Sequence, residues 1–327
     1  MPENETIVFE AKNEVGLVDD PKPAPDADEV LIETERTLIS TGTELSLLTG
    51  AFQRDTFPFR PGYCNVGEVV EVGNEVDESL LGRTVATDTA HAQYTVSTPE
   101  SCRLVPPEVD REDATFFKLA EFVMNGIRRG RLTWGETVAV FGLGLMGQLT
   151  ARFAHIAGSE TVVGLDIVPD RLALLPDHAG VVGVDSTADD WVERVTDSTG
   201  GHLADVVYEV TGNGDVLTME TDILRSQGRL VVLGSPRGET AFDFYSECHY
   251  PGFEIIGAHA TTHPETATRA SPWTETRHGE LFFDYLSDGR IEVDSLVSHR
   301  MDYREAPGAF EMLLEDRTQA MGVVLEW

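Results

Sequence analysis

Three glycines in the segment Gly142-Leu143-Gly144-Leu145-Met146-Gly147 have the spacing of a loop that binds phosphates. The apolar residues 137–141 directly before it are typical of a buried strand, and a helix-forming segment follows at once. In such a turn Gly142 permits the sharp bend, Gly144 lets the backbone approach a pyrophosphate, and Gly147 allows helix and strand to pack closely. The start of the helix adds free N–H groups and the positive end of its dipole. The segment therefore predicts a dinucleotide-binding site.

The kind of dinucleotide depends on Asp166, which ends the next predicted strand about 20 residues after the last glycine of the loop. A carboxylate at this place accepts hydrogen bonds from ribose hydroxyls and repels a 2′-phosphate. Arg171 follows shortly after it and partly compensates the repulsion. We therefore expect NAD as the cofactor, with NADP as the alternative.

The elements that position this loop alternate regularly between residue 137 and about residue 260. Short apolar strands are separated by helix-length segments, which favours parallel βαβ units with right-handed crossovers. The pattern predicts an α/β fold with a doubly wound parallel sheet of the Rossmann type. The expected strands are residues 137–141, 161–165, 205–210, 229–233 and 253–258, and the expected helices are residues 148–157, a short one from 169, and 215–224.

The residues on either side of this region follow another pattern. Residues 1 to about 110 are expected to be mostly β, because short apolar stretches alternate with clusters of turn residues. A chain of 327 residues is long for one core, so we expect two domains. The outer strands are expected at 30–32, 67–72, 84–86, 94–96 and 322–325, and the outer helices at 114–129, 275–286 and 306–314.

The chain carries a large excess of acidic residues. It has 57 Asp and Glu against 24 Lys and Arg, a formal net charge of −33, and Lys occurs only at Lys12, Lys22 and Lys118. Such a field repels phosphate backbones, so no nucleic-acid partner is expected. Molar salt shortens the Debye length to about 3 Å and relieves the repulsion among carboxylates. We therefore interpret the composition as halophilic, an adaptation to a salt-rich cytoplasm; the alternative is an ordinary acidic protein.

Membrane and disulfide-framework classes are also excluded. No apolar run approaches the about 20 residues that cross a bilayer, and residues 1–5 lack the basic and apolar character of a signal peptide. We expect a cytoplasmic protein with no membrane partner. Cys64, Cys102 and Cys248 form no CxxC pair, which argues against a structural zinc site and against a disulfide framework.

Several segments together resemble the medium-chain dehydrogenase/reductase superfamily over essentially the full chain. The resemblance implies a GroES-like β domain from both chain ends, residues 1–120 and 261–327, which clasps a Rossmann domain, residues 121–260. It also implies an active site in the cleft between them, and a homodimer paired through the strand at 253–257. The segments are Gly67-Glu68-Val69-Val70-Glu71-Val72-Gly73, Gly82-Arg83-Thr84-Val85-Ala86, His91-Ala92-Gln93-Tyr94-Thr95-Val96, residues 138–147 and Glu209-Val210-Thr211-Gly212.

A narrower likeness is to the bacteriochlorophyllide a dehydrogenase-like branch, which implies an alcohol or ketone substrate. It rests on Ile39-Ser40-Thr41-Gly42-Thr43-Glu44, residues 61–67 and Trp273-Thr274-Glu275-Thr276-Arg277. The residues expected to hold the cofactor are Gly142, Gly144, Leu145, Met146, Gly147, Asp166, Ile167, Arg171, Thr211, Gly212, Gly234 and Ser235.

The sequence departs from the zinc alcohol dehydrogenases at the metal ligands. Thr41 stands in place of the family's Cys, Tyr63 and Cys64 replace its His-Glu pair, and Lys118 or Phe117 occupies the last ligand position. Hydroxyl and ammonium groups are poor zinc ligands compared with thiolate, imidazole and carboxylate. The four-Cys lobe that holds structural zinc is missing as well. We therefore expect no zinc.

Without a Lewis acid, other groups must stabilise charge on the carbonyl or alkoxide oxygen. Tyr63 is the candidate acid or hydrogen-bond donor, helped if a cation such as Lys118 lowers its pKa. The resemblance places Thr43 and Glu44 near the nicotinamide, and His91 is a candidate proton carrier. Each has a structural alternative: packing for Tyr63, an ion pair for Lys118, a helix cap for Glu44 and a buried hydrogen bond for His91.

Residues after the last Rossmann strand are candidates for contacts with the substrate. His259 and His263 lie in the loop there, and their spacing alone is a weak sign of a metal. Arg269 and Arg277 would suit a substrate carboxylate or phosphate, and an ion pair at the surface is the alternative for both.

Three functions remain after these observations. The leading one is a zinc-independent dehydrogenase that interconverts a secondary alcohol or polyol and its ketone with NAD(P). The second is an NADPH-dependent quinone or enoyl reductase, against which Asp166 argues. The third is a catalytically silent NAD-binding structural or regulatory protein.

Overall fold

The computed structural model describes residues 3–51 and 56–327, which divide into two compact units. The first unit comprises the residues up to Lys118 and those from Gly279 onward, and the second comprises Leu119–His278. The segment 261–278, which we expected in the first domain, therefore packs with the second unit.

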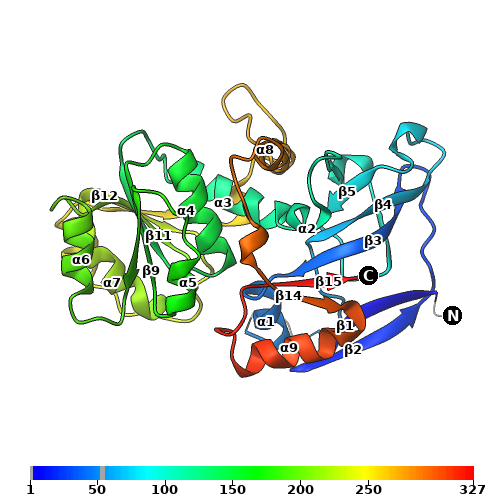
Figure 1. Cartoon of the computed structure of the whole chain (residues 1–327), viewed down its shortest axis with the longest axis horizontal. Coiled ribbons are helices and arrows are strands. Elements are labelled where there is room, and N and C mark those ends of the chain that lie inside the picture. The colour runs from blue at the N-terminus through cyan, green and yellow to red at the C-terminus, as the bar shows by residue number, and fades with distance from the viewer. Residues whose placement is uncertain (1–2, 52–55) are drawn as a thin grey trace. The chain divides into compact units, whose positions relative to one another are not determined.

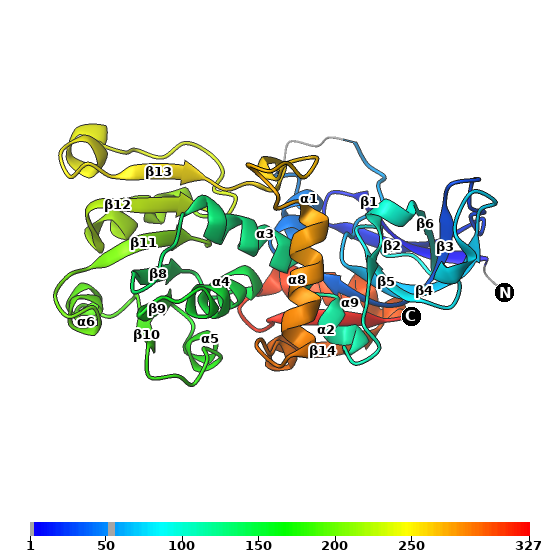
Figure 2. The same ribbon diagram turned by 90° about the horizontal axis from the view of Figure 1, so that it is seen from above.

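The second unit contains a parallel sheet of six strands in the order β10-β9-β8-β11-β12-β13 (Figure 2). The order reverses between β8 and β11, as in a doubly wound sheet, where ligands bind outside the carboxyl ends of the strands. This confirms the predicted α/β fold. The strands are β8 (Thr137–Phe141), β9 (Thr161–Asp166), β10 (Val181–Asp185), β11 (Ala204–Glu209), β12 (Leu224–Val232) and β13 (Glu254–Gly257).

Helices cover both faces of this sheet, with α3 and α4 on one face and α6 and α7 on the other (Figure 1). Buried Ala139, Val163 and Val207 of the strands form a core with Val195 of α6, and Trp191 packs edge-on against Phe141 at 5.8 Å between ring centroids. The helices are α3 (Phe117–Arg129), α4 (Leu145–Ile156), α5 (Pro169–Ala173), α6 (Trp191–Ser198) and α7 (Leu217–Asp222), with short 3-10 turns at Gly214–Val216 and Ala260–Thr262 and a π-helical turn at Tyr245–His249.

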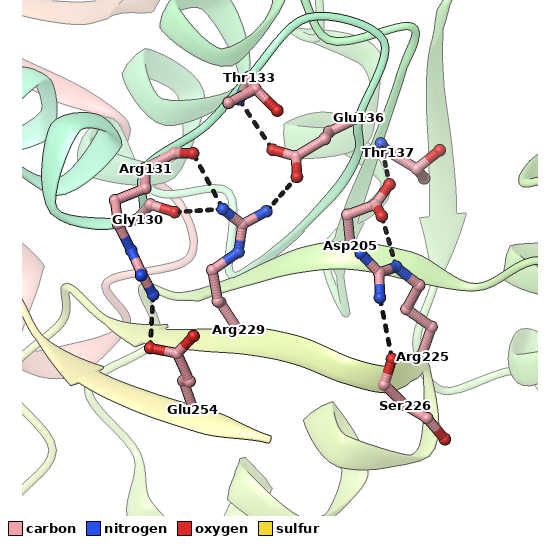
Figure 3. A network of polar contacts seen from close by, with 10 residues as sticks. All are labelled: Gly130, Arg131, Thr133, Glu136, Thr137, Asp205, Arg225, Ser226, Arg229 and Glu254. Carbon is pink, nitrogen blue, oxygen red and sulfur yellow. Dashed lines mark hydrogen bonds and ion pairs between the residues drawn. The ribbon is translucent and has the colours of Figure 1, made fainter. Parts of the chain in front are cut away.

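Arg229 is the centre of a polar network at the amino end of this sheet (Figure 3). Its guanidinium donates to the backbone oxygens of Gly130 and Arg131 at 3.0 and 2.9 Å, and it forms an ion pair with Glu136. The other carboxylate oxygen of Glu136 accepts the backbone N–H of Thr133 at 2.8 Å. The network ties the end of α3 to the start of β8 and to β12.

Two further ion pairs lie at the same end of the sheet (Figure 3). Arg225 donates to Asp205 at 2.5 Å, and the second oxygen of Asp205 accepts the backbone N–H of Thr137 at 2.8 Å. Arg131 and Glu254 pair at 2.5 Å on the surface. Each of these carboxylates therefore has a basic partner.

The first unit is built from strands of both chain ends. Its larger sheet has the order β14-β15-β3-β4-β5-β7, with β6 also paired to β3, and β1 pairs with β2 in a separate two-stranded sheet. Its strands are β1 (Asn4–Ala11), β2 (Glu14–Asp20), β3 (Val30–Ile39), β4 (Asn65–Val72), β5 (Thr84–Thr87), β6 (Tyr94–Ser97), β7 (Arg103–Leu104), β14 (Val297–Asp302) and β15 (Gly322–Glu326).

Short helices complete this unit and close its core. Phe9 of β1 meets Phe310 edge-on at 5.0 Å between centroids, and both are fully buried with Ile39 and Val323. The helices are α1 (Thr43–Leu48), α2 (Arg111–Ala114) and α9 (Ala306–Glu315), with α8 (Glu275–Ser287) crossing the boundary between the units and 3-10 turns at Glu78–Leu80, Pro99–Ser101, Asp294–Leu296 and Tyr303–Glu305.

The elements differ from the expected ones in a few places. In the first unit β1, β2, β7, β14, α1 and α2 were not among the expected elements. In the second unit β10 and α6 were not predicted, although β10 repeats the apolar pattern of β9 almost residue for residue. β10 is an edge strand, and only Val184 of it is buried, so its apolar residues give a weak signal. The helix expected over 114–129 is α3, which begins at Phe117; Ala114 is the last residue of the separate short helix α2. Among the described residues, no helix has both the length and the apolar character needed to cross a membrane.

Candidate active site

The glycine loop has the backbone geometry that its sequence predicts. Gly142 has a φ of +89°, and a Cβ added to it would lie 2.9 Å from the side chain of Thr211. A Cβ at Gly147 would lie 1.8 Å from the backbone oxygen of Gly142, so only glycine fits there. A Cβ at Gly144, the N-cap of α4, would meet nothing within 4 Å. The loop is thus packed tightly on the protein side and open at Gly144.

Asp166 fastens this loop to the end of β9. Its Oδ2 accepts the backbone N–H of Leu143 at 2.6 Å, and its Oδ1 accepts that of Val168 at 2.9 Å. The guanidinium of Arg171 lies 3.7 Å from Oδ2, and only 4% of the Asp166 side chain is exposed. Ile167 beside it is 63% exposed and offers an apolar surface. The structure therefore places the predicted acid, its neighbour and its cation together at the loop.

Glu209 holds the next two loops of the same edge. Its Oε1 accepts the hydroxyl of Thr211 at 2.7 Å and the backbone N–H of Gly212 at 2.8 Å, while its backbone oxygen accepts the N–H of Gly234 at 2.7 Å. A Cβ at Gly234 would lie 2.5 Å from Oε2, and Gly212 faces the backbone of Ser235. The family resemblance included this segment, but no role was predicted for Glu209.

A second buried carboxyl, Glu220 of α7, lies next to Glu209. Its side chain is fully buried, and within residues 3–51 and 56–327 neither of its oxygens has a hydrogen-bond partner; the same holds for Oε2 of Glu209. Burial, with the negative charge of Glu209 adding to it, raises the pKa of Glu220 to about 9. Burial also raises the pKa of Glu209. Glu220 is therefore uncharged at neutral pH, and no sequence motif marks it.

In the first unit, Glu44 and His91 form a fully buried pair. Nε2 of His91 lies 2.9 Å from Oε2 of Glu44, and Oε1 of Glu44 accepts the backbone N–H of Ser40 at 2.9 Å. Nδ1 of His91 has no partner among the described residues. A Cβ at Gly62 would lie 2.6 Å from the backbone nitrogen of His91, so any larger residue at this position would displace His91. The structure thus brings these two candidates together.

Tyr63 adjoins this pair through hydroxyl groups. Its phenol donates to the hydroxyl of Ser40, and the side chain of Thr43 hydrogen-bonds to it as well. Removal from water raises the pKa of Tyr63 far above its usual value, the neighbouring Cys64 and Glu44 raise it further, and the bonds with Ser40 and Thr43 offset only part of the rise. The lowering by a cation that we considered is therefore not observed: Tyr63 stays protonated and serves as a hydrogen-bonding group, not as a phenolate.

Lys118 is nearly buried at the start of α3. Its ammonium lies 3.4 Å from Oδ2 of Asp88, and 7% of its side chain is exposed. Lys118 therefore forms the ion pair that was its structural alternative, and its partner, Asp88, was not predicted. The roles of Ser40 and Asp88 were both missed: Ser40 lies in the segment 39–44, which was used only for the family resemblance, and Asp88 lies in no recognised motif.

Tyr63 and Lys118, which stand at positions where the family has zinc ligands, are poor zinc donors. Tyr63 is engaged with hydroxyls, and Lys118 brings a positive charge. Across the described part of the chain, no three His, Cys, Asp or Glu side chains gather so that they could hold a metal ion. Hydroxyl and ammonium groups do not replace the thiolate, imidazole and carboxylate ligands that zinc prefers.

The remaining candidates lie after β13. His259 caps the 3-10 turn Ala260–Thr262 by accepting from the backbone of Thr261. Nε2 of His263 lies 3.1 Å from Nδ1 of His278, so the second histidine of the loop contacts a residue that the sequence did not suggest. Arg269 is exposed, and Arg277 packs on Trp273.

Two family models match consecutive parts of the chain. Residues 26–140 match the alcohol dehydrogenase GroES-like domain, and residues 146–276 match the zinc-binding dehydrogenase model. The chain is similar to D-guloside 3-dehydrogenase of Escherichia coli K12, with 23% identity over 80% of this chain and 75% of the relative. It is 23% identical to L-galactonate-5-dehydrogenase of the same organism, over 92% of this chain and 93% of the relative.

Solved structures show the same fold. A putative zinc-binding dehydrogenase of Sinorhizobium meliloti 1021, solved bound to NADP, superposes with a TM-score of 0.83 over 99% of both chains at 21% identity. The two matched domains, the glycine loop and this fold together assign the chain: it is an oxidoreductase that belongs to the zinc-type alcohol dehydrogenase-like group of the medium-chain dehydrogenase/reductase superfamily.

Proposed function

We propose that this chain is an NAD(P)-dependent dehydrogenase that interconverts a secondary alcohol or polyol and its ketone by hydride transfer, without a catalytic zinc. The observation that carries the proposal is the glycine loop, which is closed against Thr211 and Asp166 but open at Gly144. The two relatives from Escherichia coli are named for acting on a guloside and a galactonate, which supports a polyhydroxylated substrate.

The cofactor would lie along the carboxyl edge of the second unit's sheet. Gly144 and the first residues of α4, Leu145 and Met146, would face the pyrophosphate with their N–H groups. Thr211, Gly212, Gly234 and Ser235 would border the next part of the dinucleotide. When bound, the nicotinamide ring accepts or donates the hydride. The protein's part is to bind and orient it.

Asp166 and Arg171 would decide between the two nicotinamide cofactors. The carboxylate favours the ribose hydroxyls of NAD, whereas Arg171 at 3.7 Å is near enough to meet a 2′-phosphate once the carboxylate charge is removed. We expect the wild type to prefer NAD and Asp166→Asn to move the ratio of kcat/KM values toward NADP by roughly tenfold, or about 1.4 kcal/mol. A wild type that prefers NADP would contradict this assignment.

We call Ser40, Thr43 and Tyr63 the hydroxyl cluster of the first unit. This cluster would stabilise negative charge on the substrate oxygen by hydrogen bonding. Tyr63 remains protonated, and its phenol would donate to a developing alkoxide in place of the Ser40 hydroxyl to which it donates in the free protein. Ser40 and Thr43 hold that phenol, and Glu44 fixes Ser40 through its backbone N–H. Glu44 also orients the buried imidazole of His91.

Turnover with a panel of polyols, simple secondary alcohols, enones and quinones tests the proposal. We expect activity with polyols, and Tyr63→Phe should lower kcat by roughly a hundredfold without changing the cofactor KM. Ser97→Ala, in β6, is the matched control for loss of a hydroxyl. Tight NAD(H) binding with no turnover of any alcohol would overturn the proposal.

The absence of a catalytic metal is tested separately. Metal analysis of the active enzyme should find less than stoichiometric zinc, and a chelator should leave kcat unchanged. Stoichiometric zinc whose removal abolishes activity would show that the hydroxyl cluster does not replace the metal.

We propose in addition that two copies pair through β13. This strand is one of the two edges of the sheet, and Ile255 on it is 42% exposed. Exposed aromatic residues precede it, with Tyr250 at 81% and Phe244 at 66% exposure. Sedimentation should show a dimer that Ile255→Lys converts to a monomer; a monomeric wild type would contradict the pairing.

We also propose that the folded protein requires salt for its stability. With 57 acidic against 24 basic residues, repulsion should lower the melting temperature in dilute buffer, and molar KCl should raise it by screening. Equal melting temperatures in low and molar KCl would contradict the halophilic interpretation and, with it, the expectation of a salt-rich cytoplasm.

A further inference from the structure

Two arginines of the second unit pack on the same tryptophan. The guanidinium carbon of Arg128, near the end of α3, lies 3.3 Å from the ring centroid of Trp273, and that of Arg277 lies 3.9 Å from it. The imidazole of His278 stacks on Trp273 with 5.5 Å between centroids and 13° between the planes. Cation–π packing of this kind holds guanidinium planes in fixed orientations. We call Arg128, Trp273, Arg277 and His278 the arginine–tryptophan cluster.

Hydrogen bonds fix which ring nitrogens carry protons in His278 of this cluster and in the adjacent His263. Because arginine only donates, Arg128 Nε donates to Nε2 of His278 at 3.0 Å, so the proton of that imidazole is on Nδ1. Nδ1 then donates to Nε2 of His263 at 3.1 Å, and Nδ1 of His263 donates to the backbone oxygen of Ala260 at 2.9 Å. The positive charge of the cluster therefore comes from its arginines and not from its histidines.

Arg128 and Arg277 bring two positive charges to the cluster, and the carboxylate of Glu275 lies 3.5 Å from Nδ1 of His263. The pKa of His278 falls to about 3, first because the ring is buried and then because His263, Arg128 and Arg277 oppose a further positive charge. Arg277 is exposed, and within the described residues its guanidinium has no carboxylate partner; it donates to the backbone oxygen of Pro272 at 3.3 Å. In a chain with 57 acidic residues, a packed guanidinium without a carboxylate partner is poised to accept an anion from solution.

The loop that carries Trp273 begins at the carboxyl end of β13, after Gly257. β13 belongs to the same sheet as β8 and β11, whose carboxyl ends carry the glycine loop and Glu209. A hydrogen bond of 2.8 Å from the buried Asn125 of α3 to Thr262 ties the loop to that helix.

We propose that the arginine–tryptophan cluster binds an oxyanion, a carboxylate or a phosphate, carried by the substrate. Arg277 presents its planar donors to the anion, Arg128 adds positive charge, and Trp273 keeps both guanidiniums in place. The substrate class is then an acidic polyol derivative, a sugar acid or a polyol phosphate, instead of a neutral polyol. This inference rests on the proposed dehydrogenase function for the identity of the substrate, but the anion site itself does not.

Binding is measured without turnover, by the fluorescence of Trp273. The ligands are inorganic phosphate, a six-carbon sugar acid, a six-carbon polyol monophosphate and the neutral polyol, and Trp273→Phe identifies the signal. We expect at least one acidic ligand to bind tenfold or more tightly than the neutral polyol. Arg277→Gln should weaken that binding at least tenfold, whereas Arg194→Gln, an exposed arginine on α6, should leave it within twofold.

The two acidic ligands distinguish a carboxylate site from a phosphate site. Equal binding of the neutral polyol, or unchanged binding in Arg277→Gln, overturns the inference. The titrations are repeated with saturating NAD⁺, and competition between NAD⁺ and phosphate would show that the cluster holds the cofactor, which also overturns it.

Kinetics separate this inference from the proposed function. If no alcohol is oxidised but Arg277→Gln still loses the acidic ligand, the anion site stands and the dehydrogenase proposal falls. If neutral polyols are oxidised and Arg277→Gln changes neither their KM nor that of the acidic forms, the dehydrogenase proposal stands and the anion site falls. If both hold, Arg277→Gln raises KM for the acidic substrate at least tenfold and leaves KM for NAD⁺ unchanged.

Discussion

At the amino ends of β8, β11, β12 and β13, Glu136, Asp205 and Glu254 each pair with an arginine, while at the carboxyl ends Glu209 and Glu220 have three oxygens without a partner within the described residues. The acidic side chains at the two ends of one sheet thus differ in whether they have partners. Paired groups stabilise the fold, whereas unpartnered groups cost stability and persist where they serve a ligand. The difference supports our proposal that the cofactor binds at the carboxyl end.

The largest expected effect comes from the glycine that packs most tightly at the carboxyl end. Gly147→Ala places a Cβ 1.8 Å from the backbone oxygen of Gly142. We expect a loss of about 3 kcal/mol in unfolding free energy from overpacking, together with loss of measurable NAD⁺ binding. Calorimetric titration and denaturant unfolding measure the two. Gly144→Ala is the control, because its Cβ meets nothing: stability should stay near wild type while NAD⁺ affinity falls. Normal NAD⁺ binding by both variants would remove the loop from the site.

The amino end is tested by breaking its central ion pair. Arg229→Met leaves Glu136 and two backbone oxygens without their donor, and the two charged side chains are only 11% and 17% exposed. We expect a loss of about 2 kcal/mol in the free energy of unfolding. The KM for NAD⁺ should not change, because this network is at the opposite end of the strands. A large rise in KM with unchanged stability would reverse the comparison.

Glu220 offers a pH test of the carboxyl end. Its pKa of about 9 in the folded protein exceeds the usual value of 4.5, so the folded state keeps a proton that the unfolded state releases between these limits. The free energy of unfolding therefore falls as pH rises through this range. Glu220→Gln removes this dependence, and we expect it to be more stable than wild type by about 1–2 kcal/mol at pH 8 and by less at pH 5.

The matched control for this variant is Glu193→Gln on the exposed side of α6. It should change stability equally at both pH values. A constant difference between Glu220→Gln and wild type from pH 5 to pH 8 would mean that Glu220 is ionised in the folded protein.

The smallest effect is expected at the rim of the amino end. Arg131 and Glu254 pair at 2.5 Å, but 57% of each side chain is exposed. Exposed pairs contribute little, so Arg131→Gln should change the unfolding free energy by less than about 0.5 kcal/mol. A melt of Arg131→Gln beside Arg229→Met would show whether burial, and not the number of ion pairs, sets the stability of this end. Equal losses in the two variants would show that it does not.

Local sequence was sufficient to predict the glycine loop and its acid. Gly142, Gly147 and Asp166 lie in one strand–helix–strand unit, so their roles follow from spacing within a short segment. The parallel sheet was predicted for the same reason, except for β10, whose exposed edge position leaves only Val184 buried.

Contacts between distant segments could not be predicted. Glu44 meets His91, and Lys118 meets Asp88, only after the strands of the first unit have paired. The direction of the shift in the pKa of Tyr63 depends on burial, and the spacing of residues in the sequence does not reveal burial. Glu220 is the clearest case, because a glutamate in a short helix is ordinarily exposed and nothing in its neighbours shows that both of its oxygens are buried.

The pairing of β3 has a consequence for the order in which the chain folds. One side of β3 is shared: residues Val30–Glu33 pair with β6, and Arg36–Ile39 pair with β15 near the end of the chain. During synthesis all six strands of the second unit are complete before residues 322–326 exist. The Arg36–Ile39 edge is meanwhile an unpaired strand that other chains can join, which makes it the point at which aggregation of the nascent protein should begin.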